Sequence, residues 1–326
     1  MTKIVVICGP TACGKTPAAV HLAQMVDGEI ISADSMQIYR QMNIGTAKVT
    51  REEMRGVPHH LIDELAPDEP YSVAIFKNRA AALIEDITAR GKMPIICGGT
   101  GFYINALLYD TDFEAEIDSD WDYRKNLETI AKEKGAEFLH NMLKDVDPEA
   151  AKSIDIGNVK RVVRALEYFR QHNALISLHN QQQMEKRQRP AYDARVFVLY
   201  GERAAMYDRI NRRVDKMLAT GLVEEVSGLL EAGYAPVLPS MQGLGYKEIV
   251  KYLQGEHSLD TAITAVKRGT RHFAKRQLTW FRHQLPGLDA RWVDIDEFSD
   301  NAAIAEEIYK ILNDNGECSN VQYCRT

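Results

Sequence analysis

Four short apolar runs stand out along the chain because they are rich in β-branched residues and show no polar alternation. They cover residues 3–8 (KIVVIC), 29–34 (EIISAD), 93–99 (MPIICGG) and 194–201 (ARVFVLYG). Strands that are apolar on both sides are typical of parallel sheets with helices on both faces. The pattern therefore predicts four strands of a buried, mostly parallel sheet.

Segments with helical periodicity lie between and after these runs. We predict helices at residues 16–26, 71–91, 203–232, 245–254 and 258–284. Alternation of strands with helices indicates a doubly wound α/β fold, in which ligands bind at the carboxyl ends of the strands.

The middle of the chain has a different character. From residue 114 to residue 190 it is charged and helical, with no strand pattern. We expect an all-helical domain at 114–190, inserted between two parts of the α/β core at 1–113 and 191–315. The second part ends in a helical C-terminal region, and residues 316–326 are expected to form a flexible tail.

Composition narrows the class of protein. The 326 residues carry a net charge of −6, which argues against indiscriminate binding of nucleic acid but allows a local basic surface. No run approaches the roughly 20 apolar residues of a membrane span, and the start of the chain does not resemble a signal peptide. The cysteine count is five, an odd number. We therefore expect a cytoplasmic protein with reduced thiols and no membrane partner.

The stretch ICGPTACGKT, residues 7–16, contains the most specific motif. It matches G-x-x-x-x-G-K-[ST], the phosphate-binding loop (P-loop), between a predicted strand and a predicted helix. Loop amides and the helix dipole favour an anion, a lysine adds charge, and a threonine hydroxyl can hold Mg²⁺. The predicted phosphate ligands, with Thr16 also the candidate Mg²⁺ ligand, are Gly9, Pro10, Thr11, Ala12, Cys13, Gly14, Lys15 and Thr16.

Polar residues follow two of the predicted strands. Asp34 ends the second strand, at a position suited either to proton abstraction or to capping the next helix. Ser35 and Gln37 lie beside it, and glutamine can read adenine through two hydrogen bonds. Thr100, after the third strand, can donate a hydrogen bond or cap a helix. The adjacent His59 and His60 have no third ligand nearby, which favours hydrogen bonding over metal binding.

Basic residues are concentrated in two segments of this acidic chain. In residues 158–170, Lys160, Arg161 and Arg164 lie largely off the apolar stripe of a helix. Residues 267–284 carry six lysines or arginines interleaved with aromatic residues. This mixture suits RNA, although each segment alone could be a solvated helix face. Residues 209–213 add an arginine group that could stabilise a departing diphosphate or form surface ion pairs.

Taken together, the motifs resemble the tRNA dimethylallyltransferases. The segments that carry the resemblance occur in the family's order: GPTACGKT, ISADSMQIYRQMNIGTAK, GVPHHLIDEL, GGTGFYINALL, KRVVRALE, DRINRRVDKMLATGLVEEV, GLGYKE and AKRQLTWFR. They cover residues 3 to about 285. Cys13 replaces the family's usual serine, and Pro17 follows the loop where alanine is common.

The resemblance implies a reaction and a set of roles. The P-loop would bind the diphosphate of dimethylallyl diphosphate with Mg²⁺, helped by Arg213 and, as second choice, Arg209. Asp34 would accept a proton from N6 of the adenosine 3′ of the tRNA anticodon. That base would be flipped out of its stack into the site. A single copy, a monomer, would suffice to hold the anticodon stem-loop. The residues implied to contact tRNA are Asp34, Ser35, Met36, Gln37, Thr100, Arg124, Lys160, Arg161, Arg164, Gln277, Trp280 and Arg282.

Three other activities share part of the pattern. A P-loop kinase of a small metabolite uses the same lysine, threonine and acid. A prenyltransferase acting on free AMP or ADP uses the same donor site. Neither requires two basic helical segments, and a non-catalytic RNA-binding protein has no use for the P-loop together with Asp34.

Overall fold

The computed structural model describes residues 1–111, 121–186, 190–285 and 287–313. The described part divides into two compact units, Met1–Leu108 with Pro190–Thr326 and Tyr109–Arg189. The sequence placed the inserted domain at 114–190. The predicted tail, 316–326, lies outside the described residues.

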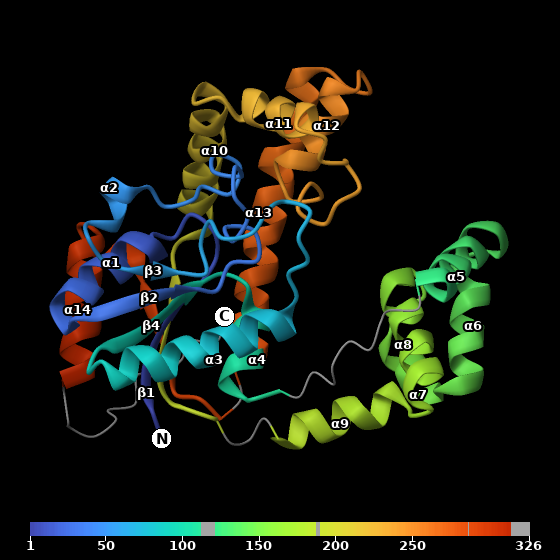
Figure 1. Cartoon of the computed structure of the whole chain (residues 1–326), viewed down its shortest axis with the longest axis horizontal. Coiled ribbons are helices and arrows are strands. Elements are labelled where there is room, and N and C mark those ends of the chain that lie inside the picture. The colour runs from blue at the N-terminus through green and yellow to red at the C-terminus, as the bar shows by residue number, and fades with distance from the viewer. Residues whose placement is uncertain (112–120, 187–189, 286, 314–326) are drawn as a thin grey trace. The chain divides into compact units, whose positions relative to one another are not determined.

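A six-stranded parallel sheet forms the centre of the first unit (Figure 1). The strand order is β3-β2-β4-β1-β5-β6. The strands are β1 (Lys3–Cys8), β2 (Gly28–Ser32), β3 (His59–His60), β4 (Met93–Gly98), β5 (Asp193–Tyr200) and β6 (Ala290–Asp294). The predicted α/β class and the four predicted strands are confirmed. The two outer strands, β3 and β6, were not predicted, because one has only two residues and the other buries only Val293.

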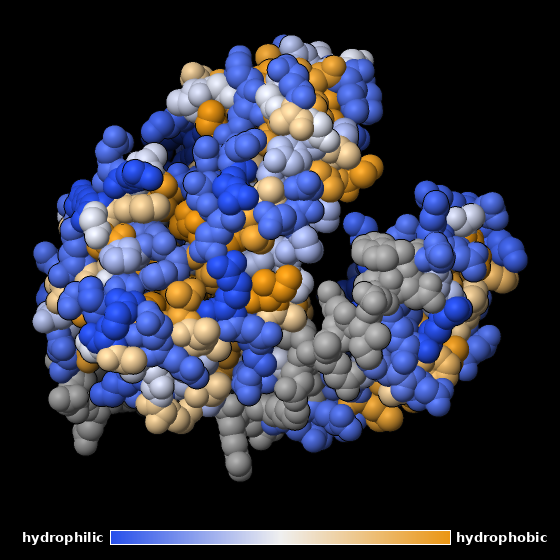
Figure 2. Space-filling view, in the orientation of Figure 1, coloured by the Kyte–Doolittle hydropathy of each residue, from blue (hydrophilic) through white to orange (hydrophobic). Residues whose placement is uncertain are grey.

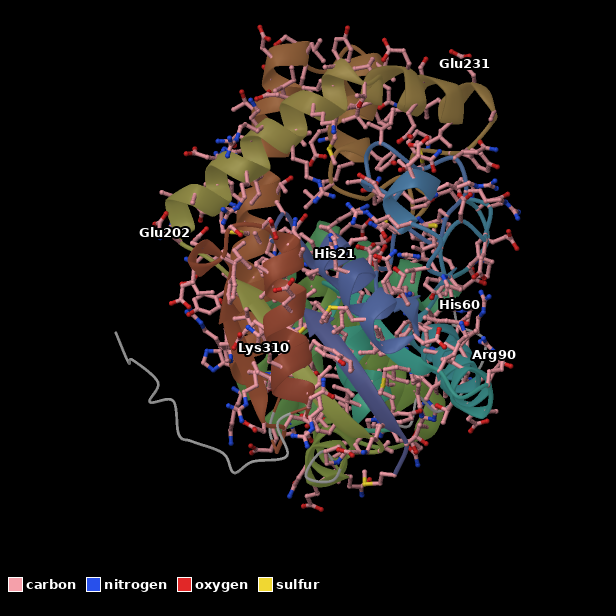
Figure 3. All side chains as sticks on the ribbon, turned by 90° about the vertical axis from the view of Figure 1, so that its left-hand side faces the viewer. His21, His60, Arg90, Glu202, Glu231 and Lys310 are labelled. Carbon is pink, nitrogen blue, oxygen red and sulfur yellow. The ribbon has the colours of Figure 1, made fainter. Side chains whose placement is uncertain are left out.

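Helices cover both faces of this sheet. On one face lie α1 (Lys15–Val26) and α14 (Asn301–Asn313), which run side by side in Figure 3. Ile7, Leu22 and Ile308 belong to the apolar core beneath them. On the other face lie α3 (Val73–Ala89) and α4 (Gly101–Leu108) (Figure 1).

The remaining helices of the first unit are α2 (Arg51–Met54), α10 (Arg203–Ala219), α11 (Leu222–Glu231), α12 (Tyr246–Leu253) and α13 (Leu259–His283); a short 3₁₀ turn spans Ile295–Glu297. The predicted single helix at 203–232 is wrong. It is interrupted by Gly221, whose φ of 101° lies outside the range of a right-handed helix. Apolar periodicity continues across this turn and therefore hides it from the sequence.

Among its described residues, the regular secondary structure of the second unit is entirely helical. Its helices are α5 (Trp121–Lys134), α6 (Ala136–Val146), α7 (Pro148–Ser153), α8 (Val159–His172) and α9 (Ile176–Lys186). Leu127, Leu139, Leu143 and Leu166 form much of its own apolar core. On the face shown in Figure 2, hydrophilic residues dominate the surface of each unit. None of the helices described here has both the length and the hydropathy required to traverse a bilayer.

Candidate active site

The phosphate-binding loop follows the central strand β1. It requires glycine at two positions: Gly9 has a φ of 142° and Gly14 a φ of 77°. A side chain on Gly9 would also collide with the carbonyl oxygen of Leu199 on β5. Helix α1 begins directly after Gly14 and has no side-chain cap, so its first N–H groups face outward for an anion.

Lys15 lies over this loop. Its ammonium group donates to the carbonyl oxygen of Pro10 at 2.5 Å and lies 3.8 Å from the buried Cys13 sulfur. An ammonium held at the loop adds a positive charge where the loop amides already favour an anion. The loop thus has the local structure that its sequence motif predicts.

A cavity of about 520 Å³ opens beside the loop. Its walls come from the P-loop and α1, from the segment between β2 and β3, and from α10. Positive side chains outnumber negative ones on these walls. The lining residues are Ala12, Gly14, Lys15, Thr16, Pro17, Val20, His21, Asn43, Ile44, Ala47, Lys48, Val49, Thr50, Glu53, Arg55, Arg213, Lys216, Met217 and Thr220.

The two predicted diphosphate arginines have different surroundings. Arg213 lines the cavity and makes no hydrogen bond or ion pair with any described residue. Burial lowers the pKa of its guanidinium, and the nearby charge of Asp34 opposes that shift. Arg209, one turn earlier on α10, forms an ion pair with Asp296 at 3.0 Å and is not among the cavity residues. Arg213 is therefore better placed for an anion than Arg209.

Asp34 caps the segment that follows β2. Its Oδ1 accepts the backbone N–H of Met36 at 2.8 Å and that of Gln37 at 3.3 Å. Its Oδ2 accepts no hydrogen bond from the described residues. Asp34 thus closes a turn through one of its two carboxylate oxygens. It does not cap the next helix, because α2 begins only at Arg51 and is capped by Thr50.

The neighbours of Asp34 tie three segments together. The Ser35 N–H donates to the Thr100 hydroxyl at 3.3 Å, which joins the end of β2 to the end of β4. The Gln37 amide donates to the carbonyl oxygens of Thr46 and Ala47 at 3.2 and 3.3 Å. Met36 packs close to Gly243. These residues shape the surroundings of Asp34, and their contact with RNA stays a prediction.

Helix α13 supplies a brace to the P-loop. The buried Gln277 accepts the N–H of Thr11 at 2.9 Å and donates to the carbonyl oxygen of Gly99 at 2.8 Å. Two bonds from one amide hold the loop against the turn after β4. This positioning role was not predicted, because Thr11 and Gln277 are 266 residues apart in the sequence.

The other two α13 residues with a predicted role lie near its end. Trp280 packs against Gly101 and stands edge-on to Phe102, with ring centroids 6.3 Å apart. The exposed Arg282 lies over the ring of Trp292 at 5.9 Å. Their predicted contact with RNA is untested.

In the helical unit, the four predicted basic residues fall into two pairs. Arg124 and Arg164 approach the fully buried carboxylate of Glu167 at 2.6 and 3.4 Å. Lys160 and Arg161 are exposed and form no ion pair with a described residue. The first pair therefore stabilises the interior of the unit, and the second is available to a partner.

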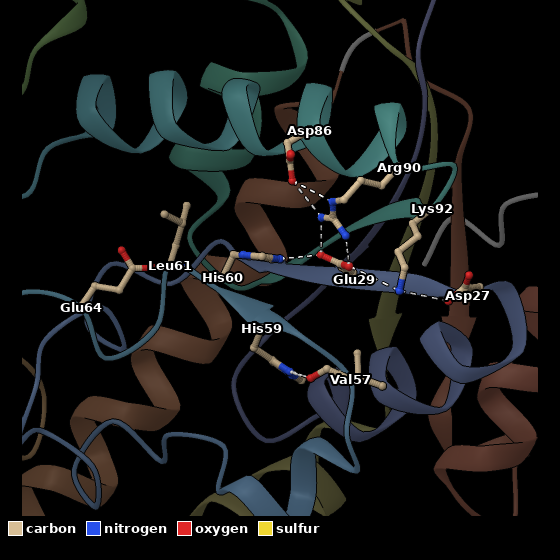
Figure 4. Close-up of polar contacts among 10 residues, drawn as sticks. All are labelled: Asp27, Glu29, Val57, His59, His60, Leu61, Glu64, Asp86, Arg90 and Lys92. Carbon is tan, nitrogen blue, oxygen red and sulfur yellow. Dashed lines mark hydrogen bonds and ion pairs between the residues drawn. The ribbon is translucent and has the colours of Figure 1, made fainter.

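The adjacent histidines serve the sheet edge (Figure 4). A His59 ring nitrogen bonds to the carbonyl oxygen of Val57 at 2.9 Å, and a His60 ring nitrogen bonds to Glu29 at 2.8 Å. The described residues contain no group of three or more acidic, histidine or cysteine side chains suited to a metal ion. The sequence preferred hydrogen bonding for both histidines, and both make hydrogen bonds.

Sequence reasoning missed several residues that build the cavity wall. Lys48, on that wall, donates to the carbonyl oxygen of Tyr39 at 2.5 Å and to Asp63 at 2.7 Å. Glu225 and Tyr246 support residues 43–45 from behind. Their motifs, IGTAK, LVEEV and GLGYKE, were visible in the sequence, but no local chemistry assigns them a role.

The parallel sheet and the G-x-x-x-x-G-K-T loop after its central strand define a P-loop α/β protein. The model of the family described as IPP transferase matches residues 37–284. The chain belongs to this family.

Similar proteins extend over almost the whole chain. A tRNA dimethylallyltransferase from Lachnoclostridium phytofermentans is 51% identical over 314 residues, covering 96% of this chain and 98% of the relative. One from Acetivibrio thermocellus is 51% identical over 311 residues, covering 94% and 96%.

Solved structures agree with these relatives. The full-length tRNA isopentenylpyrophosphate transferase from Bacillus halodurans is 42% identical with a TM-score of 0.70 and 96% of each chain covered. A eukaryotic dimethylallyltransferase acting on tRNA is 28% identical with a TM-score of 0.79, covering 96% of this chain and 79% of the other.

Proposed function

We propose that this protein transfers a dimethylallyl group from dimethylallyl diphosphate to N6 of adenosine 37, immediately 3′ of the tRNA anticodon. The products are N6-isopentenyladenosine in tRNA and free diphosphate. The observation that carries the proposal is the cavity in which Lys15, Thr16 and Arg213 line one space beside the P-loop. The relatives support the acceptor, because they are named as tRNA dimethylallyltransferases or as a dimethylallyltransferase acting on tRNA.

The reaction needs a leaving group, a nucleophile and a base. The N6 amine attacks C1 of the prenyl group while the bond from C1 to the diphosphate oxygen breaks. Lys15, Arg213 and the loop amides stabilise the negative charge that develops on the diphosphate. The free Oδ2 of Asp34 takes the proton that N6 loses.

The residues present fit a Mg²⁺ ion bound together with the diphosphate. Mg²⁺ keeps several waters and is commonly held by one or two protein oxygens plus substrate phosphates, so the hydroxyl of Thr16 at the cavity is a sufficient protein ligand. When bound, Mg²⁺ would neutralise charge on the departing diphosphate.

The acceptor side is proposed to be RNA. N6 of a stacked adenine cannot reach an enclosed donor, so the base is expected to be flipped out of the anticodon loop. We place Asp34, Ser35, Met36, Gln37 and Thr100 around the flipped base. Lys160 and Arg161 of the helical unit are the strongest candidates for contact with the phosphate backbone.

A labelled-donor experiment separates this activity from its rivals. Radiolabelled dimethylallyl diphosphate is mixed with the protein, Mg²⁺ and either tRNA or AMP. We expect label on tRNA and none on AMP. Label on AMP alone would identify an adenylate prenyltransferase. Phosphate transfer from ATP to a small metabolite, measured in a separate assay, would favour the kinase.

We further propose that the enzyme acts as a cytoplasmic monomer. Cys8, Cys13 and Cys97 are buried free thiols, which suits a reducing compartment. Sedimentation of the protein alone and with tRNA measures the number of copies, and one copy per tRNA is expected.

A further inference from the structure

A glutamate outside the proposed chemistry holds one wall of the cavity. Glu225, on α11, accepts the backbone N–H groups of Asn43 at 2.8 Å, Ile44 at 2.7 Å and Gly45 at 3.0 Å. Asn43 and Ile44 both line the cavity. A single carboxylate therefore holds three consecutive N–H groups of a wall segment that belongs to no strand or helix.

Tyr246, the first residue of α12, completes this arrangement. Its hydroxyl donates to Oε1 of Glu225 at 2.7 Å. Its ring packs so closely on Gly45 that a Cβ there would lie 2.5 Å from ring carbons. Burial and the Glu225 charge raise the pKa of Tyr246, so its hydroxyl keeps the proton that it donates. The segment is thus held by hydrogen bonds and by packing.

The chemistry of the contact requires a carboxylate. Oε2 of Glu225 accepts from Asn43 and Ile44, and Oε1 accepts from Gly45 and Tyr246. Every partner is a donor. A glutamine at this position would turn its NH₂ group toward at least one backbone N–H, which cannot accept a hydrogen bond. Hydrogen bonds to an ionised group are also stronger than neutral ones.

We propose that Glu225, assisted by Tyr246, is a positioning residue that holds residues 43–45 in the shape required to bind the diphosphate donor. The proposal rests on the proposed function for the identity of the donor. If the wall is already ordered before the donor binds, the free energy of binding does not have to include the cost of ordering it. Loss of the carboxylate releases three N–H groups, so the wall segment samples other conformations.

The test compares Glu225→Gln with Glu224→Gln, a matched change at the exposed neighbouring position. For Glu225→Gln we expect the KM for dimethylallyl diphosphate to rise about ten-fold, the effect of losing roughly one charge-assisted hydrogen bond. The KM for tRNA should stay within about two-fold, and kcat should change less than the donor KM. Glu224→Gln should behave as wild type.

A second readout follows the segment itself. Hydrogen exchange of the amides of residues 43–45 should accelerate in Glu225→Gln and not in Glu224→Gln. Tyr246→Phe, which keeps the ring on Gly45 but removes one of the four donors, should show the same changes to a smaller degree. It carries the test if Glu225→Gln does not fold.

Equal donor KM and equal exchange rates in Glu225→Gln and Glu224→Gln would overturn the proposal. Hydrogen exchange and the affinity for inorganic diphosphate can both be measured without tRNA. They therefore test the positioning role independently of prenyl transfer. An absence of prenyl transfer in the wild type would instead refute the proposed function.

Discussion

Asp34 has an observed structural role and a proposed catalytic role, which a substitution can separate. Oδ1 caps the N–H groups of Met36 and Gln37, and Oδ2 is the oxygen proposed to take the proton from N6. Asp34→Asn keeps an oxygen acceptor for the cap but cannot accept the N6 proton. We expect prenyl transfer to fall about 10²–10⁴-fold, the usual effect of losing a general base, while tRNA affinity stays within a few-fold.

Single-turnover rates and filter binding measure these two quantities. Asp34→Ala, which also removes the cap, serves as the comparison and should lower the melting temperature as well. Near-wild-type turnover in Asp34→Asn would show that Asp34 is a cap and not the base.

Arg213 and Arg209 form a matched pair, one turn apart on α10. Arg213 lines the cavity with no ion pair to a described residue, whereas Arg209 pairs with Asp296. We expect Arg213→Ala to lower kcat/KM for dimethylallyl diphosphate about 10²–10³-fold, as removal of a charge-stabilising donor does. Arg209→Ala should mainly lower stability. Steady-state kinetics with both variants decides the assignment, and a larger catalytic loss in Arg209→Ala would reverse it.

At the scale of elements, the ends of β2 and β4 meet too closely for a side chain at Gly98. A Cβ there would overlap the backbone of Ala33, the residue before Asp34. We expect Gly98→Ala to lower the melting temperature and reduce activity, because it pushes the two strand ends apart.

Gly228 provides the control. It lies within α11, and a Cβ there meets no atom within 4 Å. Gly228→Ala should therefore raise stability by roughly 0.5–1 kcal/mol through helix propensity alone. Thermal melts of both variants test the contrast, and a harmless Gly98→Ala would contradict the close approach.

A buried carboxylate also links separate elements near the edge of the sheet (Figure 4). Glu29 of β2 is nearly inaccessible and bonds to Arg90, the residue that caps the end of α3, and to His60 of β3. Hydrogen bonds from Arg90, the largest effect, lower its pKa from 4.5 to about 2. Since the folded pKa lies below the unfolded one, the stability gained is present above pH 4.5 and is lost as pH falls toward 2.

Glu29→Gln should therefore unfold more easily at pH 7, by about 1–3 kcal/mol, and should lose less stability than the wild type between pH 5 and 2. Urea denaturation across this pH range measures both effects. Asp27→Asn, a nearby exposed acid, is the control and should change little. Parallel pH curves for Glu29→Gln and the wild type would disprove the linkage.

At the scale of the whole molecule, basic residues of the helical unit can be divided into those proposed to bind tRNA and those already paired within the protein. Arg161 is exposed without an ion pair to a described residue, whereas Lys152 pairs with Glu149 at 2.6 Å. We expect Arg161→Ala to weaken tRNA binding and to reduce the slope of log affinity against log salt by about one. Lys152→Ala should alter neither. Binding titrations at several salt concentrations measure the slope, and an unchanged slope would remove Arg161 from the phosphate contacts.

Short local patterns in the sequence were enough to predict the α/β fold class. The buried strands, the P-loop with its two positive-φ glycines, and the acid after β2 are each encoded within a few consecutive residues. Apolar strands and phosphate loops depend on short-range geometry, so these features were predictable. The order of the motifs along the chain predicted the family, and the match of the family model to residues 37–284 confirms it.

The tertiary structure decided what distant residues do for one another. Gln277 binds Thr11, Glu225 holds residues 43–45, and Arg124 pairs with the buried Glu167. No local pattern predicted these contacts, because each partner is 43 to 266 residues away in the sequence. The role of a polar side chain depends on whether it is shielded from water and on which groups then replace the water as its hydrogen-bond partners. Only the folded chain determines that environment.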